Sequence, residues 1–116
     1  KKKNIFYRPW GKYTNLFRGK GFLIKELVIN PESSISLQKH TFRSEFWSII
    51  SGKAKITLNK NIFYKSMGDT IFVQKGSLHR IENFHDYPVI IMEVQLGNIL
   101  IEKDIIRYKD IYGRAR

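Results

Sequence analysis

Two stretches of this chain decide its fold: QKHTFRSEFWSIISG at residues 38–52 and GDTIFVQKGSLHRIEN at residues 68–83. Gln38 and His40 are two positions apart, so on a β-strand both side chains leave the same face. Two of the three histidines of the chain, His40 and His79, lie within these stretches. Imidazole is a common metal ligand. The two stretches therefore indicate β-strands that carry candidate metal ligands.

The intervals in both stretches resemble the two sequence signatures of the cupin family. The first signature runs glycine, five residues, His-x-His, three or four residues, glutamate, six residues, glycine, and the corresponding positions here are Glu32, Gln38, His40, Glu45 and Gly52. The second runs glycine, five residues, Pro-x-Gly, two residues, histidine, three residues, asparagine, and the corresponding positions are Gly68, Gln74, Gly76, His79 and Asn83. The resemblance implies an all-β cupin, a double-stranded β-helix with a jelly-roll-like barrel. Gly52 and Gly76 are expected in turns that a side chain would obstruct.

The cupin resemblance brings four donor side chains to one site: Gln38, His40, Glu45 and His79. Two imidazoles, a carboxylate and an amide oxygen suit a borderline divalent cation. We expect zinc, with cobalt, manganese, iron or nickel as alternatives. A single histidine is more often an ordinary core or surface residue. The expectation of a metal therefore depends on the agreement between the two signatures.

Outside these stretches the sequence also indicates strands separated by turns. Runs of apolar and β-branched residues predict strands at residues 21–29, 35–40, 45–51, 53–58, 62–64, 69–73, 78–83 and 87–96. Turn-forming residues recur between them every 8–12 residues or so, as in a sandwich or barrel. The segment from Glu102 to Asp110 is expected as a short helix or as a strap packed over the barrel. On the long strand at 87–96, Glu93 and Gln95 share a face, which either points outward or lines the barrel.

The length of 116 residues predicts a single domain over residues 1–116. We divide it into an N-terminal arm (1–7), a barrel (8–101) and a C-terminal strap (102–116). The chain has no cysteine, which is compatible with the cytoplasm. No apolar run reaches the roughly 18–20 residues that span a bilayer, and none after the N-terminal lysines has the character of a signal peptide, so we expect no membrane association. The first residue is not Met, which is consistent with a processed start or with a piece of a longer polypeptide.

The formal net charge of +11 favours an anionic partner. The lysines are scattered along the chain, and no recognised nucleic-acid-binding motif is present. We therefore expect a phosphorylated small molecule and no nucleic acid. A compositional bias that places lysines on a solvated surface is the alternative explanation of the charge.

A more specific resemblance covers residues 8–114 in unbroken order. The chain resembles the type II mannose-6-phosphate isomerase cupin, which in many bacteria is the C-terminal part of a bifunctional mannose-6-phosphate isomerase/mannose-1-phosphate guanylyltransferase. The residues that carry the resemblance are Arg8-Pro9-Trp10-Gly11, Ser36-Leu37-Gln38-x-His40, Arg43-x-Glu45-x-Trp47, Ser51-Gly52, His79-Arg80-Ile81-Glu82-Asn83, Glu93-Val94-Gln95-x-Gly97, Asp104-Ile105 and Tyr112-Gly113-Arg114. No glycine-rich phosphate loop precedes the cupin, so a nucleotidyltransferase domain is expected only as a fused or separate partner.

The resemblance implies a metal-dependent interconversion of mannose 6-phosphate and fructose 6-phosphate through an enediol. It places substrate binding on Arg43, Arg80 and Gln95, with either arginine able to hold the phosphate as a bidentate fork. Arg80 follows the ligand His79 directly, so on a regular strand it points to the opposite face unless a bulge intervenes. A surface position is the alternative for each arginine.

Catalytic roles fall on Glu93, Lys25 and Arg80. Glu93 is the first candidate for the base that moves the proton, and Glu82 is the second carboxylate that qualifies. Lys25 matches a lysine on an early strand of the family and is expected to line the cavity. It can act as a base only if burial lowers its pKa.

The chain departs from the family at three positions. The family usually reads Gln-x-His-His-His-Arg-x-Glu-His-Trp, whereas Thr41, Phe42 and Phe46 stand at the positions of the additional histidines. Two alternatives to the isomerase therefore stay open. One is a cupin that acts on another phosphorylated or nucleotide-linked sugar, for example as an epimerase. The other is a non-catalytic sugar-binding or assembly module.

We also expect a homodimer. The apolar segment Ile5-Phe6-Tyr7 and the long strand at 87–96 are the sheet edges that the sequence offers for pairing between subunits.

Overall fold

The computed structural model describes residues 4–109, and over these residues it contains strands and no helix. The strands are β1 (Asn4–Arg8), β2 (Gly11–Gly19), β3 (Phe22–Ile29), β4 (Ser33–Ser34), β5 (Leu37–Lys39), β6 (Ser44–Ser51), β7 (Lys53–Leu58), β8 (Asn61–Ser66), β9 (Thr70–Val73), β10 (His79–Asn83), β11 (Val89–Leu96) and β12 (Ile106–Lys109). The expected all-β class is confirmed. Within the described range, no helix is available to cross a bilayer.

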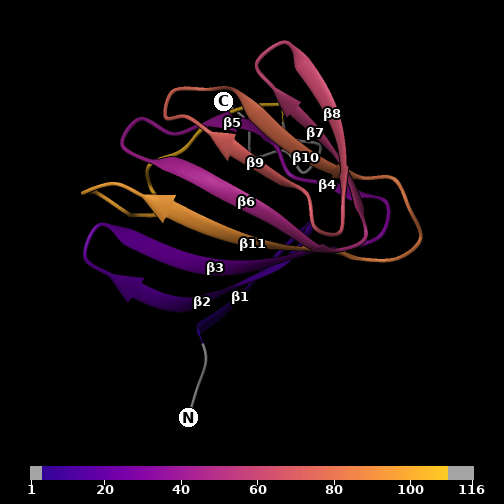
Figure 1. Cartoon of the computed structure of the whole chain (residues 1–116), viewed down its shortest axis with the longest axis horizontal. Helices are drawn as coiled ribbons and strands as arrows, with labels where there is room; N and C mark the ends of the chain where they lie inside the picture. Colours follow the sequence, from indigo (N-terminus) through magenta and orange to yellow (C-terminus); the bar gives the residue numbers. More distant parts are fainter. Residues whose placement is uncertain (1–3, 110–116) are drawn as a thin grey trace.

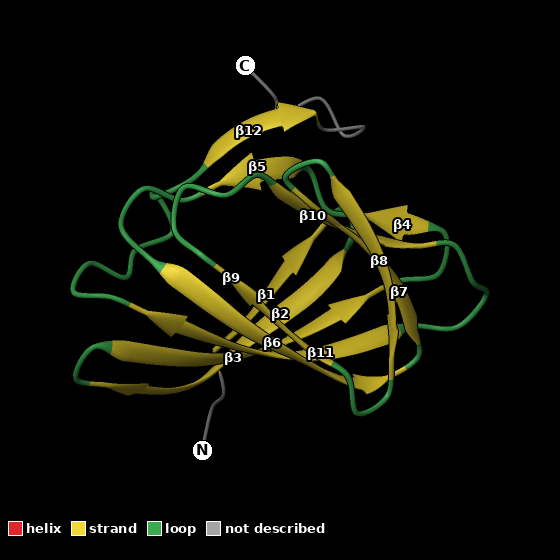
Figure 2. Cartoon of the chain, turned by 45° about the horizontal axis from the view of Figure 1, so that its top comes forward, coloured by secondary structure: helices red, strands yellow, loops and turns green. Residues whose placement is uncertain are grey.

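The strands form two antiparallel sheets that face each other (Figures 1 and 2). The first sheet has the order β1-β2-β3-β11-β6-β9. The second has the order β12-β5-β10-β7-β8, and β4 pairs with β10. Segments distant in the sequence thus become neighbours, because β5, β6 and β10 all contribute to the space between the sheets.

The inner face of the first sheet is apolar at one end and polar at the other. On β3 and β11, buried and half-buried residues alternate, as expected for strands that cover a core. The inward residues of β3 change from Ile29 and Leu27 to Lys25, which pairs in register with Glu93 of β11. The fold therefore stacks an apolar core on a polar cavity between the same two sheets.

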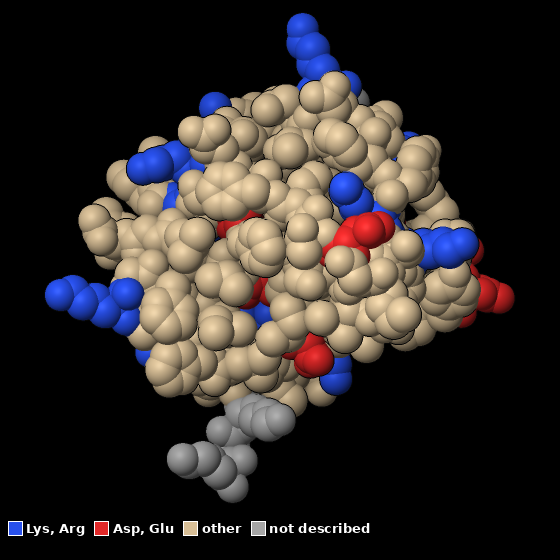
Figure 3. Space-filling view, in the orientation of Figure 1, with Lys and Arg blue, Asp and Glu red and all other residues tan. Residues whose placement is uncertain are grey.

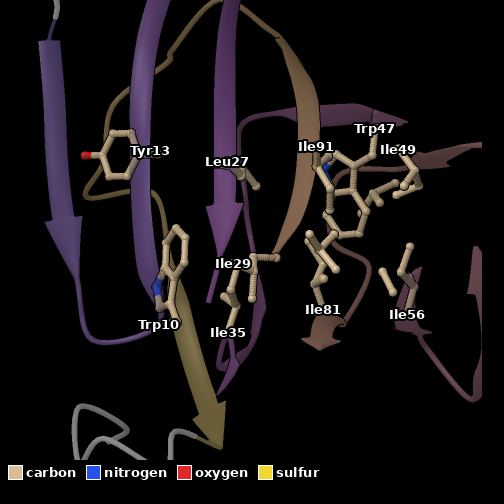
Figure 4. Packing of buried hydrophobic residues seen from close by; sticks show 13 residues of the cluster. Trp10, Tyr13, Leu27, Ile29, Ile35, Trp47, Ile49, Ile56, Ile81 and Ile91 are labelled. Carbon is tan, nitrogen blue, oxygen red and sulfur yellow. The ribbon is translucent and has the colours of Figure 1, made fainter. Parts of the chain in front are cut away.

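The core fills the apolar end (Figure 4). Aromatic side chains and branched aliphatic side chains from both sheets meet there, and Trp47 is only 1% exposed. The cluster consists of Trp10, Tyr13, Leu27, Ile29, Ile35, Trp47, Ile49, Ala54, Ile56, Val73, Ile81, Val89 and Ile91. Burial of each large member contributes about 1.5–3 kcal/mol of hydrophobic free energy, so this core holds the two sheets in place around the cavity.

The expected turns coincide with left-handed backbone conformations. Gly52 has a φ of 87°, and a Cβ there would lie 2.7 Å from the carbonyl oxygen of Pro88, so a side chain is obstructed. Gly76 has a φ of 86° but open space around it, so only its backbone conformation favours glycine. Glu32, at the first glycine position of the cupin signature, keeps a φ of 55° despite its side chain.

Every strand predicted between residues 21 and 96 is present, but the two N-terminal strands were not predicted. Residues 4–7 of the expected arm belong to β1, and β2 occupies a stretch for which no strand was expected. The pairing register of β2 shifts between Asn15 and Phe17, so its side chains do not alternate regularly. In the strap, residues 106–109 form β12, and its described residues contain no helix. The division into arm, barrel and strap stays a prediction.

One expectation about strand edges is wrong. Strand β11 lies in the middle of its sheet, hydrogen-bonded to β3 on one side and to β6 on the other, so it offers no free edge. The segment Ile5-Phe6-Tyr7 lies on β1, which ends the sheet and pairs only with β2 in the part of the chain that the structure describes.

Candidate metal centre

Three of the four expected ligands converge between the two sheets. Ligand atoms of His40, Glu45 and His79 all lie within 4.8 Å of one another, and all three side chains are buried. Glu45 comes from β6 of the first sheet, whereas His79 begins β10 of the second and His40 follows β5. Gln38 pairs in register with His79 and lines the same cavity. The structure therefore brings all four residues to one place.

Hydrogen bonds set both histidines in the tautomer that a metal requires. Nδ1 of His40 is 2.5 Å from the carbonyl oxygen of Asp104, and Nδ1 of His79 is 2.9 Å from that of Ser77. Because a carbonyl oxygen only accepts hydrogen bonds, each Nδ1 carries the proton and each Nε2 keeps its lone pair. Nε2 of His79 is buried and has no hydrogen-bond partner among the described residues. A buried acceptor without a donor fits a site that a cation completes.

The electrostatics of the cluster also fit a cation. Burial lowers the pKa of His40 to about 4 and lowers that of His79, so both rings are neutral at pH 7. Burial alone would raise the pKa of Glu45, but His40, Arg43 and His79 outweigh it and hold the pKa at about 2. Oε2 of Glu45 lies 3.1 Å from Nε2 of His40, so a carboxylate faces a lone pair. Two acceptors at this distance are compatible when a positive charge lies between them.

Arg43 and Trp47 hold the Glu45 carboxylate in place. Nε of Arg43 donates to Oε2 at 2.7 Å, and Nε1 of Trp47 donates to Oε1 at 2.9 Å. Arg43 also donates to the backbone oxygen of Ile101 and has a long contact of 3.3 Å with Nε2 of His40. Arg43 therefore orients a ligand, and a metal would have to replace only its contact with His40.

The cluster opens into a cavity of about 140 Å³. Its polar and charged lining comes from Arg8, Tyr13, Lys25, Ser36, Gln38, His40, Arg43, Glu45, His79, Glu93, Glu102 and Arg107. Cations and carboxylates are thus mixed around one small volume, which suits a ligand that is both charged and rich in hydroxyl groups.

Burial changes the acidity of Glu93, the first candidate for the base. Its carboxyl lines the cavity and accepts a hydrogen bond of 2.8 Å from Nε2 of Gln95. Burial raises the pKa of Glu93 to about 7, with the Glu45 carboxylate adding to the effect and Lys25 opposing it. Gln95 was expected to contact the substrate, but it lies outside the cavity lining. Its hydrogen bond positions Glu93 instead. Lys25 lines the cavity, and its Nζ is paired with Glu102.

Arg80 and Glu82 lie away from the cavity. Neither is among its lining residues, whereas the neighbours His79 and Ile81 are. Nε of Arg80 lies 3.6 Å from Glu82, and Nζ of Lys55 lies 3.9 Å from the same carboxylate oxygen. The regular alternation of β10 explains this placement, because consecutive side chains leave opposite faces. The expectation that Arg80 contacts the substrate is not supported by this geometry.

The three departures from the family pattern also lie outside the cavity. Thr41, Phe42 and Phe46 are exposed, and Phe46 points away from the face of β6 that carries Glu45. None of them lines the cavity. Their presence in place of histidines therefore leaves the charged lining unchanged.

Sequence reasoning assigned no role to several residues that shape the site. Asp104 accepts hydrogen bonds from the backbone nitrogens of Thr41 and Phe42, and its own carbonyl oxygen accepts from His40. Arg8 and Tyr13 also line the cavity. Arg8 and Asp104 belong to segments that matched the family without an assigned function, which was the available signal. Tyr112-Gly113-Arg114 lies outside the described residues.

Comparisons with known proteins agree on one family. Residues 1–110 match the family model "Mannose-6-phosphate isomerase C-terminal". The chain is 40% identical over 109 residues to the alginate biosynthesis protein AlgA of Pseudomonas putida, 36% to the xanthan biosynthesis protein XanB of Xanthomonas campestris and 34% to the mannose-1-phosphate guanylyltransferase ManC of Salmonella typhimurium. Each alignment covers 94% of this chain but only 22–23% of the relative. The chain thus spans under a quarter of the length of these relatives.

Solved structures confirm the cupin fold. The structure resembles the Mn(II)-containing oxalate decarboxylase of Bacillus subtilis with a TM-score of 0.79, at 20% identity over 90% of this chain and 29% of that one. A double-stranded β-helix protein of Klebsiella pneumoniae gives 0.72, at 16% identity over 84% and 83% of the two chains. The Cnp3 cupin domain of Schizosaccharomyces pombe gives 0.69, at 18% identity over 74% and 64%.

Proposed function

The chain belongs to the mannose-6-phosphate isomerase C-terminal family, and we propose that it is a metal-dependent aldose–ketose isomerase for mannose 6-phosphate and fructose 6-phosphate. One observation carries the proposal: a buried cluster of two neutral imidazoles and a carboxylate shares a cavity with a carboxyl group whose pKa is about 7. Isomerisation needs these two features together, because a proton leaves one carbon while negative charge develops on the neighbouring oxygen.

We assign the metal to Gln38, His40, Glu45 and His79. Bound there, a divalent cation would supply Lewis acidity that stabilises negative charge on the sugar oxygens at C1 and C2. The donor set fits zinc, as well as manganese, cobalt, iron or nickel. The Mn(II) centres of the structurally similar oxalate decarboxylase support a cation in this fold. Arg43 and Trp47 hold the Glu45 carboxylate, so the ligand is oriented before the cation arrives.

Glu93 is the residue that moves the proton in this proposal. At neutral pH, about half of its carboxyl groups are ionised, so the group both accepts and returns a proton readily. It would take a proton from C2 of mannose 6-phosphate and return it to C1 of the enediol. Gln95 donates to Oε2 of Glu93 and so fixes the direction of the carboxyl group.

A second candidate function is a non-catalytic module within a larger enzyme. The relative from Salmonella typhimurium is a mannose-1-phosphate guanylyltransferase, and only 23% of its length corresponds to this chain. A nucleotidyltransferase domain, fused or separate, is therefore the partner that we propose. The cytoplasm stays the predicted location, because the sugar phosphates and nucleotide sugars on which the proposed isomerase or the larger enzyme would act are cytoplasmic metabolites.

A coupled assay for fructose 6-phosphate separates these functions. We expect turnover of mannose 6-phosphate by the metal-loaded chain, loss of turnover with a chelator, and a decrease in kcat of about 100-fold or more for Glu93→Gln. The control is Glu26→Gln, on the outer face of β3, which removes the same charge without touching the cavity. Bound metal without turnover would contradict the isomerase and favour the module. Turnover restricted to another phosphorylated or nucleotide-linked sugar would contradict the assigned substrate.

A further inference from the structure

Two of the cations that line the cavity, Arg8 and Lys25, make contacts outside the ligand cluster. Arg43 is committed to Glu45 and Ile101, as described above. Arg8 and Lys25 also line the cavity, but within residues 4–109 their hydrogen bonds and ion pairs go to groups outside the cluster. A buried or partly buried cation is costly unless it serves a partner. The partners of these two residues therefore indicate what the outer part of the cavity binds.

Lys25 is paired with a carboxylate that is easily withdrawn. The lysine side chain is 4% exposed, whereas its partner Glu102 is 53% exposed. Nζ of Lys25 lies 2.5 Å from Oε2 of Glu102. Glu102 is in the strap, in a turn outside any strand, 77 positions away in the sequence. The buried ammonium group of Lys25 is thus neutralised by the carboxylate of a residue, Glu102, that is half exposed to solvent.

Tyr13 links Lys25 to Arg8. Nζ of Lys25 lies 4.1 Å from the centre of the Tyr13 ring, and Cζ of Arg8 lies 5.1 Å from the same centre. Nη2 of Arg8 donates to the Tyr13 hydroxyl at 3.2 Å. Burial raises the pKa of Tyr13, and the nearby Glu102 carboxylate adds to the effect, so the hydroxyl keeps its proton at neutral pH. Two cations and a hydroxyl donor are therefore grouped around one ring.

Arg8 has donor capacity to spare. Its guanidinium group donates to the backbone oxygen of Tyr7 and to Tyr13, and it has no carboxylate partner among the described residues. A guanidinium group carries five N–H donors, and the flat contact with an aromatic ring leaves its edge available for an oxyanion.

We propose that Arg8, Tyr13 and Lys25 form an anion subsite that Glu102 occupies in the free protein, and that the phosphate of a sugar phosphate displaces Glu102 on binding. The proposal rests on the isomerase function for the identity of the sugar, but not for the binding of an oxyanion. It assigns the phosphate to Arg8 and Lys25, whereas the sequence suggested Arg43 and Arg80. The ligand cluster would then receive the opposite end of the sugar in the same cavity.

The exchange is favourable in charge. A phosphate monoester carries up to two negative charges and three acceptor oxygens, whereas Glu102 offers a single charge, paired with Lys25. Glu102, being half exposed, recovers its hydration when it leaves. The carboxylate thus keeps Lys25 paired between substrates and competes only weakly with a dianion.

Sulfate is the probe for the test, because it is a dianion that does not precipitate divalent metals. Binding to the metal-free chain is followed by amide chemical shifts, with chloride keeping the ionic strength constant. We expect Glu102→Gln to bind sulfate about five- to tenfold more tightly and Arg8→Gln to bind it about five- to tenfold more weakly. Mannose 6-phosphate should compete with sulfate, and mannose should not.

Two variants control for the high net charge of the chain. Lys20→Gln removes an exposed cation at the end of the β2–β3 hairpin, and Glu26→Gln removes an anion from the outer face of β3. Both should change sulfate affinity by less than about twofold. Equal affinity in Glu102→Gln and the wild-type chain, or in Arg8→Gln and Lys20→Gln, would overturn the subsite. Binding of sulfate with these variant effects but no isomerase activity would support the subsite and contradict only the proposed reaction.

Discussion

The unpaired Nε2 of His79 is, within residues 4–109, the most specific mark of a cation site at the scale of single residues. His79→Ala should lower metal affinity by more than about 100-fold, because loss of an outer-shell partner alone typically costs 10- to 100-fold. The substitution should also lower the free energy of unfolding, and by more in metal-loaded protein than in metal-free protein, since the cation binds only the folded chain. Equilibrium dialysis and urea unfolding with and without metal measure both effects.

The third histidine provides the matched control. His85 stacks on Tyr87 at 5.2 Å, away from the cluster and outside the cavity lining. His85→Ala should keep wild-type metal affinity. Stoichiometric metal in His79→Ala at neutral pH would rule out His79 as a ligand.

The raised pKa of Glu93 should make the stability of the fold decrease as the pH rises toward neutrality. Its pKa is raised from 4.5 to about 7, so the folded chain binds more protons than the unfolded chain between these values. The contribution of Glu93 to stability is therefore fully present below pH 4.5 and is lost as the pH rises to 7. In metal-free protein, raising the pH from roughly 4.5 to 8 should lower the free energy of unfolding of the wild type by about 3 kcal/mol more than that of Glu93→Gln.

Thermal or urea unfolding across this pH range gives the difference curve. Glu45 behaves in the opposite way, because its lowered pKa stabilises the fold above pH 4.5, and this contribution is lost only as the pH falls toward 2, below the range compared. Parallel stability curves for the two proteins would show that Glu93 is not held in its raised-pKa state. In Glu93→Gln the new side-chain amide oxygen can still accept the hydrogen bond from Gln95, so the donor is not left without a partner.

The candidate ligands were predictable because their spacing is a property of the sequence, whereas the roles of the charged residues were not. Gln38, His40, Glu45 and His79 lie at the intervals of the two cupin signatures that the chain resembles, and the structure brings them together. Arg43 was expected on the phosphate, but its partner Glu45 is two residues away on the same face of the chain. Which of two nearby anions an arginine binds depends on side-chain conformation, which the sequence pattern does not contain.

At the scale of elements, the strap fixes the ligand loop between β5 and β6. The Asp104 carboxylate accepts from the nitrogens of Thr41 and Phe42 at 2.7 and 2.9 Å, and the Asp104 carbonyl oxygen holds Nδ1 of His40. Asp104→Ala should lower metal affinity by about 10- to 100-fold, as expected for a partner that orients a ligand. Calorimetric titration with zinc measures the change.

Asp104→Asn separates positioning from simple destabilisation. Its amide oxygen can accept one of the two hydrogen bonds, so it should restore part of the metal affinity. Substitution of Co(II) should show altered visible absorption in Asp104→Ala, because the ligand geometry changes. Lys103→Ala, an exposed neighbour on the same strap, should match the wild type. Equal affinity in Asp104→Ala and Lys103→Ala would mean that the strap does not position His40.

Strands β3 and β11, which alternate strictly, were predicted correctly, whereas β2, which does not, was missed. Strands β3 and β11 alternate between buried and half-buried residues along their length. Strand β2 has a bulge and three consecutive exposed residues, so its sequence does not show which face is buried. The same limit explains the wrong edge at β11: a buried central strand and an apolar edge strand have the same hydrophobic sequence, and only the sheet order distinguishes them.

At the scale of the whole molecule, the formal net charge is +11. On the face shown in Figure 3, lysine and arginine side chains lie as separate groups near the rim, with carboxylates and a broad uncharged area between them. Over the described residues, a continuous basic stripe, which would indicate a nucleic-acid surface, is absent from that face. Four further cations, Arg8, Lys25, Arg43 and Arg107, line the cavity.

The homodimer stays a prediction, and of the two edges that the sequence offered only β1 ends a sheet. This strand is the end of its sheet, and its side chains Ile5 and Tyr7 are 40% and 72% exposed. We expect sedimentation velocity at micromolar concentration to show a dimer that tightens with salt, because salt screens the repulsion between two chains of charge +11. Tyr7→Lys should shift the chain toward monomer, since charged side chains on an edge strand oppose strand pairing.

Tyr64→Lys is the matched control, because Tyr64 is equally exposed, at 76%, on β8 at the end of the other sheet. A dimer broken by Tyr64→Lys and kept by Tyr7→Lys would transfer the interface to β8, and a wild-type monomer would exclude both edges.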